Sequence, residues 1–445
     1  MSPSRGLHRL PLRFTRAYTT SSQPPSQLPS KTPIELLRAS PHRLHIYRST
    51  STNPFFNLST EDYLLRHSPT NSTILFTYTN RPSIILGRNQ NPWSEVNIPL
   101  LNSPLYKDNV TLVRRRSGGG TVYHDLGNLC WSVIMPRKSF DRDINAHMVV
   151  SALHRLGITT ATVNSRHDIV LRQLDPKNGK EKDLKVSGSA YKIIRERSYH
   201  HATLLLNSKL EDIKHLLRSP LKEFITTKGV ESVRSEVSNI GVEKEKLVET
   251  IEEEFLKVNK VEDGEVVSRV TVEEEETCSV REYIKEGMME LQSTKWLYTQ
   301  TPDFTLHLPP QTPLPELPGL PGIQPVLPEH SKFSLLSTTS HLQNIQFSTS
   351  PDPDFSFVQS QESHIRLLKT PFSGISLNKG INSINSIPED VKTSLGKWLQ
   401  VAVGEWGGEG GVDLWKGRDG GKSMRLRAVE REAERKRHAQ AKAES

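Results

Sequence analysis

The chain of 445 residues, with 34% hydrophobic residues and 29 prolines, is long enough for two domains but contains much irregular sequence. Its formal net charge of +8 is concentrated in residues 1–34 and 417–445, which leaves the remainder close to neutral and argues against a nucleic-acid partner. Two cysteines cannot build a disulfide framework or a four-thiolate metal site, and the lack of a long apolar run predicts no membrane span.

The first residues have the composition of a mitochondrial transit peptide. Arginines are spaced among apolar residues from Arg5 to Arg16, serine and threonine follow, and no acidic residue precedes Glu35. We expect residues 1–40 to direct the protein to the mitochondrial matrix, with cleavage near Tyr18. An unstructured basic terminus is the alternative.

From about Leu44 the sequence becomes typical of a folded domain. Runs of β-branched and aromatic residues at 73–80 and 82–88 predict two adjacent strands. Residues 110–117 and 128–136 predict strands that lead into and out of a glycine-rich turn.

Residues 142–158 predict an amphipathic helix with Asp143 near its start and Gly157 at its end. Its apolar stripe should pack on the sheet and consists of Ile144, Met148, Val149, Ala152, Leu153 and Leu156.

Further along, residues 185–193 and 199–207 predict a hairpin, and residues 210–219 and 242–258 predict helices. Strands and helices follow one another without regular alternation. The predicted fold class is therefore α+β.

The composition changes after residue 240. Residues 271–277 form an acidic run that we expect to be solvated, and residues 309–328 form a proline-rich insert that we interpret as an extended, poorly ordered spacer. Strand-like stretches at 294–304 and 363–370 suggest a smaller second domain, which we place at 280–410 and which precedes a basic tail at 417–445.

The stretch RRRSGGGTVYHDLGN, residues 114–128, could bind an anion. Gly118 to Gly120 allow a ligand to approach the backbone, whose N–H groups can face an anion, and Arg114, Arg115 or Arg116 can supply a planar donor to phosphate or carboxylate. A surface hairpin with solvated arginines is the alternative for this stretch taken alone.

Lys185 is the second candidate. If residues 185–191 form one strand, Lys185, Ser187, Ser189 and Tyr191 share a polar face, from which the lysine could reach a phosphate or a developing negative charge. A solvated strand lysine is the alternative.

Other candidates have less support. His200 and His201 should face opposite sides of a strand and cannot chelate one metal as a pair, and Cys130 should be a buried, inert thiol. The stretch 417–423 is one residue short of a phosphate-binding P-loop and follows no apolar strand.

Taken together, the motifs resemble the lipoate-protein ligase A family. Six stretches occur in the order found in that family, at 53–65, 85–97, 114–128, 185–192, 199–207 and 227–240. The resemblance covers roughly residues 44–310 and implies a catalytic domain at 44–250 with the biotin/lipoate ligase fold, related to class II synthetase cores, followed by an accessory domain.

The resemblance also implies a reaction in two steps. Lipoate and ATP would give lipoyl-AMP and pyrophosphate, with Mg²⁺ as the accompanying ion, and a lysine of an acceptor protein would then attack the activated carbonyl. The implied acceptors are the lipoyl domains of 2-oxoacid dehydrogenase E2 subunits and the glycine-cleavage H protein.

Family site residues carry over to matching positions of this chain. Lys185 would be the catalytic residue, in contact with both nucleotide and lipoyl carbonyl, and Asp168 would lie near the Mg²⁺ ion. The remaining nucleotide-binding residues would be Arg115, Gly120, Thr121, Val122 and Tyr123, and the remaining lipoate-binding residues Gly118, Gly119 and His124.

The sequence departs from the bacterial pattern at two positions of the site. Arg116 occupies a position that is serine there, and His167 precedes Asp168 where the bacterial pattern has asparagine.

Three other functions compete with the ligase. They are a transferase that uses a preformed lipoyl or octanoyl donor, a biotin ligase, against which the Arg-x-Ser-Gly-Gly-Gly form argues, and a non-catalytic scaffold.

Overall fold

The computed structural model describes residues 42–404, apart from 176–177, 262–264, 330, 339–340, 350–362, 372 and 386. The expected transit peptide, the basic tail and the stretch 417–423 lie outside the described residues. In the part of the chain that is described, no helix is long and apolar enough to cross a membrane.

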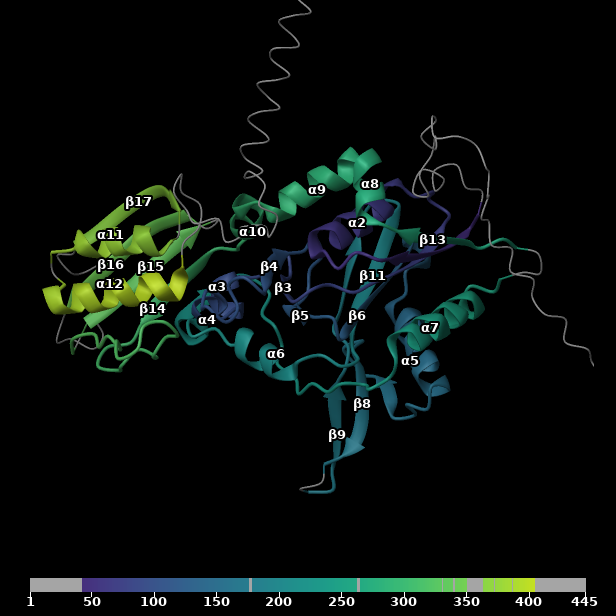
Figure 1. The fold of residues 1–445 in the computed structure, drawn as a ribbon. Helices are drawn as coiled ribbons and strands as arrows, with labels where there is room; N and C mark the ends of the chain where they lie inside the picture. Colours follow the sequence, from purple (N-terminus) through teal and green to yellow (C-terminus); the bar gives the residue numbers. More distant parts are fainter. Residues whose placement is uncertain are drawn as a thin grey trace, which may run out of the picture.

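A six-stranded sheet forms the centre of the larger domain (Figure 1). Side chains alternate between its two faces, so that Leu75 and Trp131 pack into one core while Phe76 and Cys130 pack into the other. In spatial order the strands are β10 (Ser189–Ile193), β11 (Arg197–Leu205), β6 (Asn128–Pro136), β2 (Thr73–Tyr78), β1 (Leu44–Ser49) and β13 (Ser268–Val272). Because β13 pairs with β1, this sheet extends beyond residue 250, the boundary expected from the sequence.

Helices cover both faces of this sheet. Helices α5 (Arg142–Arg155) and α7 (Lys244–Val258) pack on one face, and α2 (Pro54–His67) and α9 (Glu282–Gln292) pack on the other. The prediction of α5 is confirmed, because Asp143 lies in its first turn and Gly157 follows its end with a φ of +87°. The residue that caps the helix is Asp141, which was not singled out from the sequence. Ile144 was wrongly assigned to the apolar stripe, since it lies in the first turn and is 50% exposed.

The glycine-rich segment belongs to a separate three-stranded sheet. Its strands are β4 (Thr111–Arg114), β3 (Ser83–Leu86) and β5 (Val122–His124), in that order. The prediction that β2 and β3 are adjacent was wrong, because β2 belongs to the six-stranded sheet. The strand that follows the glycines is β5, which pairs with the opposite edge of β3 from β4, so the glycine-rich loop crosses the end of β3.

The predicted strand from Lys185 to Tyr191 is interrupted. Strand β9 (Glu181–Lys185) pairs with β8 (Ile169–Leu174), and these two strands project as a hairpin in Figure 1. Val186 is fully buried at the break, after which β10 joins a different sheet. The antiparallel hairpin of β10 and β11 is confirmed. Strand β7 (Ala161–Val163) pairs with the other edge of β8 and completes the three-stranded sheet of β7, β8 and β9.

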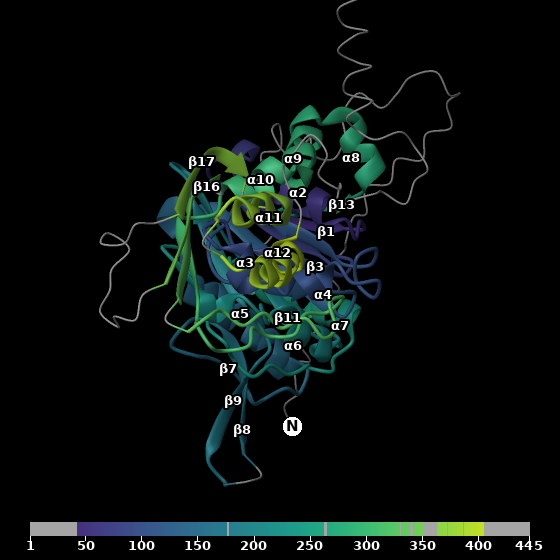
Figure 2. The ribbon, with the colours of Figure 1, turned by 90° about the vertical axis from the view of Figure 1, so that its left-hand side faces the viewer.

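The second domain is built on a five-stranded antiparallel sheet. Helices α11 (Gly374–Asn382) and α12 (Glu389–Val403) accompany it and lie in front in Figure 2. Its strands, in spatial order, are β12 (Ile225–Thr227), β14 (Phe304–Leu308), β15 (Ser331–Thr338), β16 (His341–Thr349) and β17 (Ser363–Pro371). Strand β12 lies within residues 44–250, the expected catalytic domain, yet it pairs with β14 of the second domain. The two domains are therefore joined by backbone hydrogen bonds.

Short helices connect the two domains. The stretch at 294–304 was wrongly interpreted as strand-like along its whole length, because Ser293 caps helix α10 (Thr294–Thr299) by accepting a hydrogen bond from the Trp296 N–H. The other short helices are α3 (Pro92–Glu95), α4 (Ile98–Leu101), α6 (Leu210–Leu216) and α8 (Glu274–Val280).

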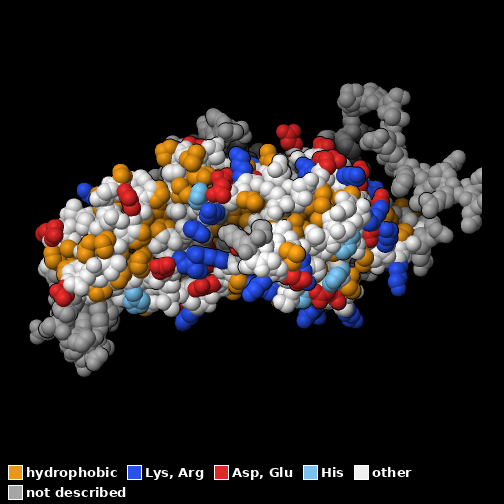
Figure 3. All heavy atoms as spheres, turned by 90° about the horizontal axis from the view of Figure 1, so that it is seen from below, with side chains coloured by type: hydrophobic (Ala, Val, Ile, Leu, Met, Phe, Trp, Pro, Cys, Tyr) orange, Lys and Arg blue, Asp and Glu red, His pale blue; other side chains and the backbone are white. Residues whose placement is uncertain are grey.

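Basic and acidic side chains are intermixed over the face seen in Figure 3, as expected for a nearly neutral body.

The acidic run is only partly solvated, contrary to expectation. Its first residues complete β13 beside β1, and Glu274 accepts a hydrogen bond from Asn53 Nδ2 at 2.8 Å. The run therefore helps to hold the start of α2.

The proline-rich insert is not a spacer. Leu314, Leu317 and Leu327 are buried in the core of the second domain, and Trp398 Nε1 donates to the Pro315 carbonyl at 2.8 Å. The prolines restrict the backbone, and the leucines between them supply apolar area that a packed core can bury.

We predict that Leu317→Ala lowers the free energy of unfolding of the second domain by roughly 2 to 5 kcal/mol, because it leaves a cavity in that core. Chemical denaturation followed by tryptophan fluorescence should detect the change. Thr312→Ala, at an exposed position of the same insert, serves as the control. Equal stability of the two variants would contradict the role of the insert in the core and would favour its interpretation as a spacer.

Candidate active site

A cavity of about 240 Å³ lies between the glycine-rich loop, the β9–β10 connection and residues 230–233. Among its lining residues, Leu58, Tyr78 and Ile85 are buried and define what we call the deep end, whereas exposed Arg166 and partly exposed Lys185 define the outer end. Apolar surface at one end and charge at the other suit a ligand with a hydrocarbon body and a polar head.

The glycine-rich loop folds closely over the end of β3. A Cβ atom on Gly87 would lie 1.9 Å from the Gly119 carbonyl oxygen, so the two backbones meet where no side chain fits. Gly119 has a φ of +84°, a conformation that favours glycine. The Thr121 N–H donates to Ser232 Oγ at 2.9 Å, which fixes the far end of the loop.

Most of the expected site residues line this cavity. Arg115, Gly119, Gly120, Thr121, Val122, His124, Asp168 and Lys185 do so. Gly118 and Tyr123 are the exceptions. Tyr123 packs in another core, with its hydroxyl 3.3 Å from Asp212 Oδ2.

Arg115 holds the loop from inside. Its Nη1 donates to the Ile85 carbonyl at 3.1 Å, and its Nη2 donates to the carbonyls of Gly118 and Gly120 at 2.5 and 2.8 Å. Burial lowers the pKa of this guanidinium to about 10, so it stays charged at neutral pH.

Arg114 is not available to a ligand. It is fully buried and donates to the Leu297 carbonyl at 2.6 Å, to the Gln90 carbonyl at 2.7 Å and to Thr301 Oγ1 at 2.9 Å. The prediction that Arg114 could bind the anion was therefore wrong. This arginine joins β4 to α10 and to the segment after it, because backbone oxygens and the Thr301 hydroxyl satisfy its donors.

Lys185 and Asp168 form an ion pair at the outer end of the cavity. Lys185 Nζ lies 2.8 Å from Asp168 Oδ2, because Asp168 directly precedes β8, whose Val170 pairs with Lys185 at the end of β9. Asp168 is 6% exposed, so the carboxylate is held in place by the fold. An anionic ligand at this end would meet a cation that already has a defined position.

Uncharged polar groups lie near the deep end. His124 Nδ1 lies 2.9 Å from Asn80 Nδ2, and burial lowers the pKa of His124 to about 3, so its imidazole is neutral. Cys130 Sγ lies 3.6 Å from His124 Nδ1, and burial raises the pKa of the Cys130 thiol. The prediction of a buried, unreactive Cys130 is confirmed.

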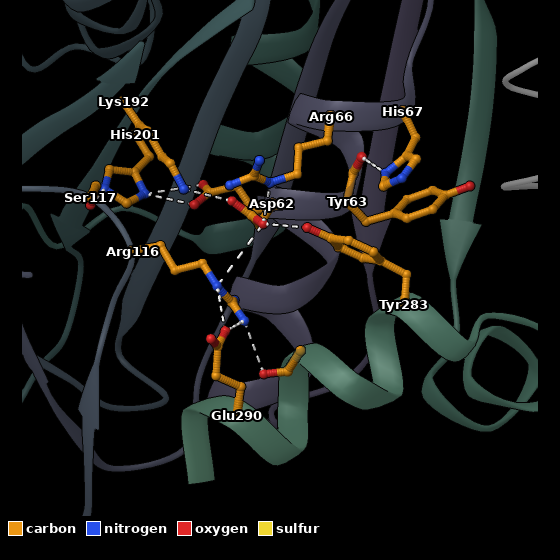
Figure 4. A network of polar contacts seen from close by, with 12 residues as sticks. Asp62, Tyr63, Arg66, His67, Arg116, Ser117, Lys192, His201, Tyr283 and Glu290 are labelled. Carbon is orange, nitrogen blue, oxygen red and sulfur yellow. Dashed lines mark hydrogen bonds and ion pairs between the residues drawn. The ribbon is translucent and has the colours of Figure 1, made fainter. Parts of the chain in front are cut away.

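A second buried arrangement was missed from the sequence. His201 Nδ1 lies 2.9 Å from Glu61 Oε2, and His201 Nε2 lies 2.9 Å from Ser117 Oγ (Figure 4). Because a carboxylate only accepts, Nδ1 carries the hydrogen. Residues 53–65 contain the acidic pair Glu61 and Asp62, but their sequence carries no signal that would connect Glu61 with His201.

His200 faces the opposite side of β11, as the strand pattern predicted. Its ring packs edge-on against Trp131 with centroids 5.1 Å apart, and among the residues that the structure describes neither ring nitrogen has a hydrogen-bond partner. Burial lowers the pKa of His200 to about 3. It contributes packing, whereas His201 belongs to the site.

Comparison with known proteins identifies the family. The model of the lipoyl protein ligase A/B catalytic domain matches residues 53–258. A Schizosaccharomyces pombe protein, named for lipoate-protein ligase A, is 43% identical over 276 residues, which cover 58% of this chain and 71% of that protein. The chain is thus an enzyme of the ligase class, with the α+β catalytic fold expected from the sequence. It belongs to the lipoate-protein ligase A family.

Solved structures with a similar fold were also found. A Plasmodium falciparum protein described as LipL1 in complex with lipoate is 23% identical, with a TM-score of 0.48, over 80% of this chain and 99% of that chain. A bipartite lipoate-protein ligase with its E2 lipoyl domain, from Thermoplasma acidophilum, is 22% identical with a TM-score of 0.43, over 56% of this chain and 92% of that chain. A lipoate-protein ligase A described with bound ATP is 21% identical with a TM-score of 0.42, over 56% of this chain and 94% of that chain.

We predict that acid destabilises the protein in part through His200. Its pKa is lowered in the folded state, so stability is fully present above the ordinary value near 6.5 and falls as the unfolded chain takes up a proton below it. His200→Phe should therefore flatten the dependence of the unfolding free energy on pH between about 6 and 4 by one proton, roughly 1.4 kcal/mol per pH unit. Denaturation at several pH values measures the slope, and an unchanged slope would contradict the burial of a neutral imidazole.

Proposed function

We propose that the enzyme activates lipoate with ATP and transfers the lipoyl group to a lysine of an acceptor protein. The observation that carries the proposal is the cavity, which has an apolar deep end and the Lys185–Asp168 pair at its outer end. A lipoyl chain would occupy the deep end and place its carboxylate near Lys185.

The first step joins two anions. The lipoate carboxylate attacks the α-phosphorus of ATP, the bond to the pyrophosphate breaks, and lipoyl-AMP remains bound. Carboxylate and phosphate repel each other unless positive charge lies between them. Lys185 would supply that charge, and the loop held by Arg115 would present the backbone to the nucleotide.

The second step forms the amide. The ε-amine of the acceptor lysine attacks the lipoyl carbonyl, AMP leaves with the pair of electrons of the broken bond, and the amine loses a proton. Asp168 lies at the outer end of the cavity, where the amine must arrive, and is our candidate for accepting or orienting that proton.

Mg²⁺ fits this site as a companion of the nucleotide. In the described ranges, no group of three or more His, Cys, Asp or Glu side chains could hold a metal. Asp168, which lines the cavity, could offer a carboxylate, and Mg²⁺ commonly combines one or two carboxylates with substrate phosphates. The ion would screen charge on the phosphates.

The family acts on proteins that carry lipoyl domains. We propose the E2 subunits of 2-oxoacid dehydrogenases and the glycine-cleavage H protein as the acceptors of this enzyme. Their lysine must reach the outer end of the cavity, so the acceptor should approach beside the β8–β9 hairpin, whose base carries Asp168 and Lys185.

A transferase that uses a preformed donor is the second candidate. It is favoured by the present partners of the cationic groups, since Arg115 is bonded to loop carbonyls and Lys185 to Asp168. We prefer the ligase, because the loop and Lys185 are suited to stabilising charge on the α-phosphate during adenylate formation, a step that a transferase does not perform.

A reconstituted assay separates the two reactions. Purified enzyme, free lipoate, Mg-ATP and an apo lipoyl domain should yield a lipoyl-lysine mass shift together with AMP and pyrophosphate. Modification that occurs only with presynthesised lipoyl-AMP or a lipoylated H protein as donor would establish the transferase. Failure with every donor, despite ATP or lipoate binding, would favour the scaffold.

In the same assay, Lys185→Ala should reduce lipoyl-AMP formation by about a hundredfold, the usual cost of one donor to a charged transition state. Lys185→Gln keeps a hydrogen-bond donor beside Asp168 and isolates the loss of charge. Lys182→Ala, on the same strand and paired with Glu236, is the matched control. Near-normal adenylate formation by both Lys185 variants would remove Lys185 from the mechanism.

We also propose that the enzyme works in the mitochondrial matrix, on the basis of the acid-free, arginine-rich residues 1–34. A reporter fused to residues 1–40 should enter mitochondria and lose its N-terminus near Tyr18. Cytosolic retention of the reporter, or an intact Met1 on protein purified from the organelle, would contradict this localisation.

A further inference from the structure

Arg116 and Ser117 precede the three glycines, and each makes polar contacts with residues outside the glycine-rich loop (Figure 4). Ser117 is held through His201 by Glu61 of helix α2. Arg116 points the other way, toward α9. The start of the loop is therefore fixed from two directions by groups that do not belong to the loop.

Arg116 is attached to α9 by three contacts. Its Nη2 donates to the Gly287 carbonyl at 3.1 Å and to Glu290 Oε2 at 2.5 Å, and its Nε donates to the same carboxylate at 3.2 Å. The guanidinium also lies over the Trp296 ring, 5.7 Å from its centroid. The Arg116 side chain is 10% exposed, whereas the carboxylate of Glu290 is 48% exposed, so the arginine is largely buried and its partner faces solvent.

A buried carboxylate lies behind this arginine. Asp62 Oδ2 is 4.0 Å from Arg116 Nε, and Asp62 accepts hydrogen bonds at 2.8 Å from each of Lys192, Arg66 and Tyr283. Burial would raise the pKa of Asp62, but the attraction of Lys192, with Arg66 and Arg116, lowers it to about 2. Asp62 is thus a fixed negative charge at neutral pH that joins α2, β10 and α9.

The helix surface is shaped for this approach. A Cβ atom on Gly287 would lie 3.0 Å from Ser59 Oγ and 3.4 Å from Arg116 Nη2, so a side chain there would separate α9 from α2 and from the arginine. The absence of a side chain lets the guanidinium reach the helix backbone.

We propose that Arg116 is a positioning residue for the glycine-rich loop. It does not line the cavity, so it acts through the loop that it precedes, and its partner in this role is Glu290 of α9. The inference rests on the proposed function for the identity of the ligand. Without Arg116 the loop would keep its sequence, but its first residues would lose one of the two supports described above.

A positioning role has a recognisable kinetic consequence. The loop would sample conformations that cannot bind, so affinity for ligand would fall while the bound enzyme would react at nearly the normal rate. Since hydrogen bonds to charged groups are typically strong, we expect Arg116→Ala to weaken the binding of a non-hydrolysable ATP analogue and of lipoate by about tenfold. The single-turnover rate at saturation should stay within about twofold.

Hydrogen exchange reports on the loop without any ligand. Arg116→Ala and Glu290→Gln should both speed the exchange of amides in residues 115–122 of the full-length enzyme, and the double variant should be no faster than Arg116→Ala alone. Arg116→Lys keeps the charge without the planar fork and should give an intermediate rate. Glu286→Ala, one turn earlier on α9 and exposed, is the control and should match wild type.

The outcomes are distinguishable. Unchanged exchange in the loop, strictly additive effects of Arg116 and Glu290, or a fall in single-turnover rate with unchanged affinity would each overturn the positioning role. Glu290 is half exposed, so Glu290→Gln tests the contact even if Arg116→Ala fails to fold. A wild-type enzyme that binds neither ATP analogue nor lipoate would instead refute the proposed function, and loop exchange would still decide the role of Arg116.

Discussion

The site depends on one buried cation, the guanidinium of Arg115. It has no carboxylate in its hydrogen-bond shell, and its donors are taken up by the Ile85, Gly118 and Gly120 carbonyls and by Ser117 Oγ. A buried charge without such partners would be costly, so the loop has to close around the arginine. Closure brings the backbone of the loop to the cavity wall, which is where a nucleotide or acyl group can be held.

Residues of other elements also hold the glycine-rich loop closed around Arg115. The chain from Ser117 through His201 to Glu61 ties the loop to α2, and Arg114 ties the preceding strand to the segment after α10. The three consecutive arginines therefore have separate roles. The middle one organises the loop, while its neighbours join the loop to the elements that lead into the second domain.

Local patterns were predicted where local physical chemistry decides them. Helix α5, with its aspartate cap and terminal glycine, and the hairpin of β10 and β11 needed only near neighbours in sequence. Most of the failures concern which segments pack together. Strands β2 and β3 went to different sheets, the strand after Lys185 broke at buried Val186, and leucines among the prolines found a core to fill.

The sequence by itself determined the α+β class, the family and the residue types that could read an anionic ligand, because these follow from composition and from motifs of a few residues. Only the tertiary structure decided which of those residues meet. Glu61 and His201 are 140 positions apart and Arg116 and Glu290 are 174 apart. Such pairs form because the sheet and α9 bring distant segments together, and buried charges then select the partners that satisfy them.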